Sequence, residues 1–321
     1  MKRYIGKRAL SGLLIVILSV CFNFTLIRLA PGDPIRIMAG TDNPNEEMIE
    51  TLQKKYGLDK SIPEQFVMFL GQVAQGDLGY SYISDESVVT LISDKIGPTL
   101  ALSLTSVTLA VTFGTILGIY AARKNGSWFD RFVCGISYVF DATPGFWLGL
   151  MMILIFASTL KWFPTSGMVN LRANYTGFAR FLDICRHLVL PEATQVLVQA
   201  PYYFRIARSS LLQVMTEDFI TTFRATGMKE SRIFNKYVLR NAIMPTITVL
   251  GMSLAHLLSG SVLIETVFAW PGMGRLMYNS ISKRDYPVLT GIYLVTSVVI
   301  CIAMILVDIL YGFIDPRIRY D

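Results

Sequence analysis

Charge is scarce in this chain. Of its 321 residues only 16% are charged, whereas soluble domains carry about a quarter. Apolar residues make up 53%, and the mean hydropathy is +0.49. This balance excludes an ordinary soluble domain and indicates a protein built to lie in a lipid bilayer.

Residues that carry catalysis or bind metals are also few. The four cysteines are scattered, with Cys185 alone in an expected external loop, so no disulfide framework is expected. The two histidines, His187 and His256, lie too far apart for a zinc pattern. No Gly-x-x-x-x-Gly-Lys-Ser/Thr loop is present, and the Gly-rich stretch 270–275 is typical of a tight turn. The chain is therefore not expected to be an enzyme or to hold a cofactor or metal.

Long uncharged runs are abundant. A helix needs about 20 apolar residues to cross a hydrocarbon core of about 30 Å. Four runs reach or approach that length, namely Ala9–Ile27, Pro98–Ala122, Ala242–Ile264 and Val288–Val307. Two further runs contain polar residues or prolines, namely Phe132–Leu160 and His187–Phe204. We therefore predict an all-α polytopic membrane protein with six transmembrane helices, the fourth being the least apolar.

The first run is expected to be retained in the membrane. It is longer than the apolar region of about 7–15 residues in a secretory signal, and no small-x-small cleavage site follows it.

Lysine and arginine define an orientation. Residues 1–8, 122–132, 205–241 and 315–321 hold 16 of them in 63 positions, whereas 31–97, 161–186 and 265–287 hold 12 in 116. Because basic residues favour the cytoplasmic side, both termini are expected there. The 161–186 loop is an exception, with four basic residues against one acid. The net charge of +6 is spread over several segments, so it reflects topology and not a nucleic-acid surface.

The external segment after the first run has its own helical signals. Glu46 and Glu47 favour a helix start after Pro44, and Gly57 favours its end. Ser61 and Glu64 have the spacing of a capping box for a second helix through about Ala74. We predict a small helical cap on the outer surface. The expected segments are 1–98 with the first span and cap, 99–308 as the membrane core, and 309–321 as a cytoplasmic tail.

The segment from Glu217 to Pro245 is charged although apolar runs flank it. Gly227 is placed to break it into two helices. Apolar residues recur at helical spacing on both sides of Gly227, beside basic residues on other faces. One interpretation is an amphipathic hairpin on anionic lipid; the other is a surface that a soluble partner grips.

Six ordered motifs resemble one family over nearly the whole chain. Beside the loop centred on Gly227, they are Arg28–Pro34, Gly76–Ser81, Arg240–Pro245, Glu265–Arg275, Arg284–Pro287 and Asp315–Tyr320. Together they resemble the permease subunits of ABC importers of the dipeptide, oligopeptide and nickel family, which have the type I importer fold. In that family the cytoplasmic loop docks in a groove of the ATPase.

The resemblance implies partners and a set of loop residues. The partners are a second homologous permease, two ABC ATPase subunits that bind ATP and Mg, an external substrate-binding protein and the lipid bilayer of the cytoplasmic (inner) membrane, with no nucleic acid. The residues expected to couple to the ATPase are Thr221, Thr222, Phe223, Arg224, Ala225, Gly227, Arg240, Asn241 and Pro245.

The loop departs from the family at its name-giving positions. Thr221, Thr222 and Phe223 occupy the places of Glu-Ala-Ala. Phe223 is the larger departure, because a small residue is usual there. It suggests an ATPase surface adapted to this chain.

Four polar residues are candidates for a translocation path, namely Asp141, Gln195, Gln199 and His256. A carboxylate within a span is costly, so Asp141 either lines the path and favours cationic cargo or reaches cytoplasmic water. Gln195 and Gln199 share a helix face and either line a cavity or hydrogen-bond between packed helices. His256 is expected to be buried and satisfied, in preference to being a metal ligand.

The resemblance implies ATP-driven alternating access for short peptides, with nickel or a metal chelate as the alternative cargo. A membrane receptor or scaffold that signals through the cytoplasmic hairpin is the alternative from another class.

Overall fold

The computed structural model describes residues 2–29, 35 and 46–314. Apart from an isolated bridge between Tyr80 and Ser87, the regular structure of these residues is helical. The elements are α1 (Lys2–Leu29), α3 (Glu46–Tyr56), α4 (Ile62–Ala74), α5 (Val88–Arg123), α6 (Trp128–Ala142), α7 (Gly145–Met152), η1 (Ile153–Thr159), α8 (Gly177–Val214), α9 (Asp218–Ala225), α10 (Glu230–Arg232), η2 (Ile233–Val238), α11 (Leu239–Ala242), α12 (Met244–Ala255), η3 (Leu257–Ser259), α13 (Val262–Val267), α14 (Met273–Lys283) and α15 (Tyr286–Ile314). The predicted all-α class is confirmed.

Within the described residues, four helical stretches are long and apolar enough to cross a membrane, namely Leu10–Leu29, Val88–Arg123, Glu230–Ala255 and Tyr286–Ile309. A fifth is obtained if α6 and the helix Gly145–Thr159 form one span bent by 100°. The predicted fourth span lies inside α8, a continuous helix of 38 residues that is too polar to be counted. The predicted number of six is therefore not confirmed.

Two predicted spans differ from the observed helices. The third was expected over Phe132–Leu160 with Pro144 inside it, and the helix is interrupted there, because Thr143 is extended (φ −86°, ψ 125°) and α7 begins only after Pro144. A residue before proline avoids the α region, and proline has no N–H to donate, so the helix breaks there. The fifth was expected to reach Ile264, but α12 ends at Ala255 and Gly260 adopts φ +64° soon after.

The residues pack as two compact units, which are described separately. The first comprises residues 1–99, 258–262 and 271–321, and the second comprises 100–257 and 263–270. The segmentation at residues 98 and 308 stays a prediction.

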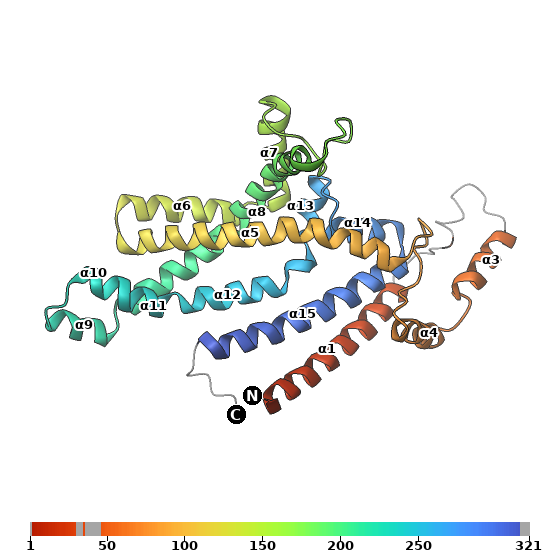
Figure 1. Ribbon diagram of the computed structural model, residues 1–321, viewed down its shortest axis with the longest axis horizontal. Helices are drawn as coiled ribbons and strands as arrows, with labels where there is room; N and C mark the ends of the chain where they lie inside the picture. The colour runs from red at the N-terminus through yellow and green to blue at the C-terminus, as the bar shows by residue number, and fades with distance from the viewer. Residues whose placement is uncertain (1, 30–34, 36–45, 315–321) are drawn as a thin grey trace. The chain divides into compact units, whose positions relative to one another are not determined.

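In the first unit, α1 and α15 lie side by side (Figure 1). Ser19 and Ser297 hydrogen-bond at 3.1 Å, and Gly12 leaves room for the Cys301 side chain. Arg8 Nε lies 2.6 Å from an Asp308 carboxylate oxygen. The helix that opens the chain is therefore bound along its length to the one that closes the described residues.

The cap helices belong to this unit and follow their sequence signals. α3 begins at Glu46, and Gly57 adopts φ +63° directly after its last residue. Ser61 and Glu64 form the predicted capping box at the start of α4, with Ser61 N–H donating to the carboxylate at 3.0 Å. The hydrogen bond from the Ser61 hydroxyl holds the pKa of Glu64 below its ordinary value. The start signal at Pro44 lies outside the described residues.

Asp285, the residue directly before α15, is hydrogen-bonded to the segment between α4 and α5. It is buried and accepts from Ser81 Oγ at 2.5 Å and from Tyr82 N–H at 3.0 Å. Because the buried carboxylate has hydrogen-bond donors, its burial is compensated. Two of the motifs that carried the family resemblance, 76–81 and 284–287, thus meet in space.

In the second unit, α5 and α8 approach closely along a row of small residues. Ala110, Gly114, Gly118 and Ala122 recur every four residues on α5 and are all buried. A Cβ added to Gly114 would lie 2.5 Å from the carbonyl oxygen of Ala200, and one on Gly118 would lie 2.8 Å from that of Phe204. Small residues at this spacing let helix backbones come together in membranes.

Candidate functional site

The segment from Glu217 to Pro245 folds as predicted into helices on either side of Gly227. α9 ends in a Schellman motif, because Gly227 N–H donates to the Arg224 carbonyl at 3.0 Å and Met228 N–H donates to the Phe223 carbonyl at 3.1 Å. Gly227 has φ +75°, which glycine adopts without strain. A helical run then follows through α10, the π-helical η2 and α11. These hydrogen bonds and the positive φ of Gly227 define the geometry of the turn that follows α9.

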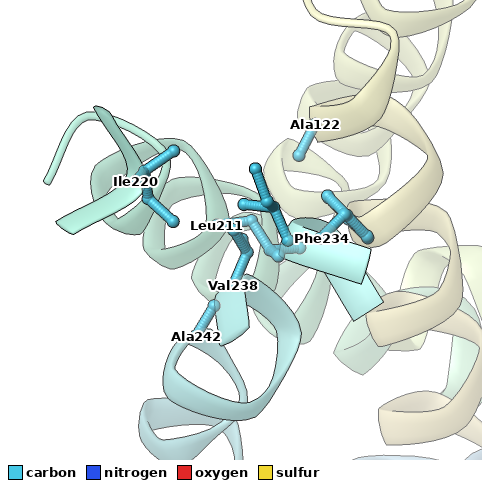
Figure 2. Packing of buried hydrophobic residues seen from close by; sticks show 7 residues of the cluster. Ala122, Leu211, Ile220, Phe234, Val238 and Ala242 are labelled. Carbon is cyan, nitrogen blue, oxygen red and sulfur yellow. The ribbon is translucent and has the colours of Figure 1, made fainter. Parts of the chain in front are cut away.

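This loop is anchored by its own hydrophobic cluster. The buried members are Ala122, Leu211, Ile220, Ile233, Phe234, Val238 and Ala242. Figure 2 shows side chains of the loop gathered with Leu211 of α8, and Ala122 of α5 near Phe234. The Arg123 guanidinium also lies over the Phe234 ring, 4.3 Å from its centroid. The loop is therefore packed on the ends of α5 and α8.

Phe223 packs against this hydrophobic cluster. It is half-buried, with its ring centroid 4.3 Å from that of Tyr237 and 5.9 Å from that of Phe219. Tyr237 lies beyond the turn, so the stack joins the two halves of the loop. A ring at this position thus has an intramolecular role, and the expected adaptation of a partner surface to Phe223 stays a prediction.

The other face of α9 is open. Thr221, Thr222, Arg224 and Ala225 are exposed, and so is Gly227. Arg224 Nε donates to Glu230 at 2.7 Å across the turn, and this hydrogen bond raises the pKa of Arg224 above its ordinary value. The loop thus presents an exposed helical edge on a fixed base.

The residues that close the loop are also accessible. Arg240, Asn241 and Pro245 are exposed, and Asn241 Nδ2 donates to the Tyr237 carbonyl at 2.8 Å. Pro245 lies in the first turn of α12, where its missing N–H costs no helical hydrogen bond.

Beside the loop, an ion pair that the sequence analysis missed joins α6 to α8. Arg208 donates from Nε and Nη2 to the two carboxylate oxygens of Asp130, at 2.7 and 2.8 Å. Asp130 is only 3% exposed and also accepts from Gly126 N–H at 2.9 Å. Arg208 reaches Asn125 at 3.1 Å as well. The two partners are 78 positions apart in the sequence, which explains why no local pattern revealed the pair.

Asp141 is paired as well. It lies 2.9 Å from Arg205 Nη1 and accepts from Nη2 at 3.0 Å, and both side chains are substantially exposed. Its charge is therefore matched by a residue of the chain itself.

The other path candidates are dispersed. Gln195 is buried, Gln199 is half-buried, and His256 is exposed at the end of α12. The expectation that His256 is buried was wrong, because the helix ends one residue before it. No hydrogen bond among these described side chains joins one path candidate to another.

Glu192 is a buried carboxylate on α8 that is not among the predicted site residues. Glu192 Oε2 accepts from Thr105 at 2.8 Å and from Ser106 at 3.1 Å, both on α5. Glu192 Oε1 and the nearby Gln195 Oε1 are buried without a hydrogen-bond partner. The spacing of Thr105 and Ser106 opposite Glu192 depends on how α5 and α8 pack, which the sequence alone did not reveal.

Helices long and apolar enough to cross a membrane, together with an exposed helical loop anchored on the ends of α5 and α8, indicate a polytopic membrane protein. The chain belongs to the family described as binding-protein-dependent transport system inner membrane component, whose model matches residues 114–320. The model of that family's N-terminal part matches residues 1–104.

Two similar proteins align with nearly all or all of this chain. The di/tripeptide transport system permease protein DppB of Pseudomonas aeruginosa is 40% identical over 313 residues, covering 93% of each chain. The oligopeptide transport system permease protein AppB of Bacillus subtilis is 35% identical over 324 residues, covering 100% of each. A chain in an inward-facing structure of the MetNI methionine ABC transporter has a TM-score of 0.55 and 18% identity, covering 71% of this chain and 97% of that one.

These similarities confirm the type I importer permease fold and the family resemblance. The chain is a multi-pass inner-membrane permease subunit of an ABC importer, and it works with an ATPase and a substrate-binding protein. ATP hydrolysis belongs to a separate subunit, so the chain is not itself the enzyme.

Proposed function

We propose that this permease carries short peptides into the cell by ATP-driven alternating access. The relatives reported above are named for di/tripeptides and oligopeptides, which favours peptides over nickel or a metal chelate as cargo. Family membership likewise favours transport over a receptor that signals through the loop.

The proposed assembly contains a second, homologous permease and two ATPase subunits that bind ATP and Mg. Both termini of this chain lie in the cytoplasm. The distribution of lysine and arginine supports this orientation, because the segments assigned to the cytoplasm, which include most of the Glu217–Pro245 loop, carry these residues at the higher density.

The observation that carries the coupling proposal is the contrast between the two faces of α9. Ile220 is buried in the cluster on the ends of α5 and α8, while Thr221, Thr222 and Arg224 are exposed. A partner that grips the exposed edge therefore pulls on two long helices through packed side chains. The Schellman turn and the Phe223–Tyr237 stack keep the two halves of the loop together, so displacement is transmitted and not absorbed.

A single exposed threonine tests this mechanism. Thr221→Arg places a long charged side chain on the proposed docking edge without touching the buried cluster. We expect the variant to lose co-purification with the ATPases and peptide-stimulated ATP hydrolysis in lipid. Thr165→Arg is the matched control, because Thr165 is also exposed but lies in a predicted external loop. If Thr221→Arg assembles and hydrolyses ATP like the wild type, the loop is not the docking element.

The cargo is tested by uptake in a strain that lacks this gene, with a panel of short peptides against nickel. Restored uptake of peptides alone, on returning the gene, supports the proposal. Restored uptake of nickel alone refutes the peptide assignment while leaving the importer intact.

A further inference from the structure

The first unit contains a cavity of about 530 Å³ between the cap and the adjoining ends of α1 and α15. This volume is in the range of sites for small molecules. Its lining contains four cationic side chains, of Arg28, Lys54, Lys55 and Lys60, against two carboxylates, of Asp77 and Asp85. Nothing in the coupling mechanism uses this cavity.

Arg28 is one of the cations that line the cavity. Its guanidinium lies 3.4 Å from the centroid of the Phe24 ring, and Nε donates to Gln65 at 2.7 Å. Nη1 is buried and, among the residues that the structure describes, has no hydrogen-bond partner. A guanidinium carries five N–H donors and binds planar oxyanions with two parallel hydrogen bonds. A buried cationic nitrogen without an acceptor is costly, so it favours a ligand that brings one.

The other cations differ in how far they are neutralised. Lys54 lies 3.2 Å from Glu50, and Lys55 lies 3.5 Å from Asp85. Lys60 Nζ contacts only the weak acceptor Met68 Sδ, at 3.2 Å, among the hydrogen bonds of the described side chains. Arg28 Nη1 and Lys60 Nζ thus have no hydrogen bond to an oxygen acceptor among the described residues, and an anionic ligand can supply one to each.

We propose that this cavity binds a short peptide, with Arg28 and Lys60 holding its C-terminal carboxylate. Tyr56, Tyr82 and Phe69 on the wall offer apolar surface to the peptide's side chains. Asp77 and Asp85 offer acceptors to its ammonium group, so both charges of a zwitterion are matched. The proposal rests on the proposed peptide function and adds a cargo subsite in the cap. A phospholipid headgroup phosphate has the same oxyanion chemistry, and the experiment separates the two.

The test measures binding of trialanine and of trialanine amide to the assembled complex in nanodiscs, without the binding protein. Wild type is expected to bind trialanine more tightly than the amide. Arg28→Gln is expected to weaken trialanine binding by about 10- to 100-fold, the range for one hydrogen bond to a charged group, and to leave amide binding unchanged. Lys60→Gln, at an exposed residue, is expected to weaken trialanine binding in the same direction without affecting folding. Lys283→Gln, exposed and outside the cavity lining, is the matched control.

Three results overturn the proposal. The first is equal binding of trialanine and its amide. The second is unchanged trialanine binding in both Arg28→Gln and Lys60→Gln. The third is loss of a tightly bound phospholipid from Arg28→Gln, seen by mass spectrometry, with trialanine binding intact, because the headgroup then fills the cavity. Trialanine uptake in cells distinguishes failure of the cap site from failure of the proposed peptide import. If cells take up trialanine although one of these results is found, the proposed peptide importer stands and only the cap site is refuted. If wild type neither takes up peptides nor shows peptide-stimulated hydrolysis, the proposed function itself fails.

Discussion

Replacing Gly114 by alanine tests the close packing of α5 on α8. The added Cβ would lie 2.5 Å from the Ala200 carbonyl oxygen and 2.8 Å from Tyr203 Cβ. The first of these atoms is backbone, so no side-chain rotation relieves the contact and the helices must separate. Overpacking of this kind costs about 1–3 kcal/mol.

A matched control removes the effect of helix propensity. Gly135, in the interior of α6, has no atom within 4 Å of an added Cβ. Alanine gains the same intrinsic preference at both positions, about 1 kcal/mol, so this term cancels when the two variants are compared. Gly114→Ala is therefore expected to be about 1–3 kcal/mol less stable than Gly135→Ala.

The assay is unfolding of each variant in nanodiscs, followed by intrinsic fluorescence and by size-exclusion chromatography after heating. The midpoint for Gly114→Ala is expected to lie below that of Gly135→Ala. Equal midpoints, or a higher one for Gly114→Ala, would show that the two helices do not approach through this row of small residues.

Two further predictions concern the loop and its neighbourhood. Asp130→Asn leaves Arg208 without its carboxylate partner and is expected to lower the free energy of unfolding by up to about 3 kcal/mol. This is less than for a fully buried pair, because Arg208 is partly exposed. Asp141→Asn breaks an exposed pair and is expected to change the free energy of unfolding by less than about 1 kcal/mol. Equal unfolding midpoints for these two variants would contradict the ranking. Phe223→Ala removes the contact with Tyr237 and is expected to lower the free energy of unfolding by at least about 0.5–1.5 kcal/mol. It is also expected to reduce peptide-stimulated ATP hydrolysis more than basal ATP hydrolysis. Loss of both activities to the same degree would contradict a role for Phe223 in transmitting motion through the loop.

Local patterns in the sequence predicted what depends on neighbouring residues. The two cap helices, the Ser61–Glu64 box and the break at Gly227 are confirmed because each arises from backbone geometry or a cap within a few positions. Composition predicted the membrane class for a similar reason, since a long apolar run needs no knowledge of its partners.

Other features depend on pairing between distant segments. Asp130 with Arg208, and Glu192 with Thr105, come together only because α6 and α5 each pack against α8. Hydropathy also overestimated two spans, because an uncharged run continues through Thr143–Pro144 and past Ala255 although the backbone does not remain helical there. Phe223 looked like a surface departure because the sequence does not reveal that Tyr237 lies against it.

The pairing of α1 with α15 has a consequence for biosynthesis. α1 ends at Leu29, and its partner begins only at Tyr286. At about 5–20 residues per second, the ribosome takes on the order of 10–50 s to make the intervening chain. During that time the hydroxyl of Ser19 and the charge of Arg8 lack the partners that α15 later supplies. The packing of α1 is thus completed only after α15 has been made, and a chain interrupted before α15 leaves these two polar groups of α1 without those partners.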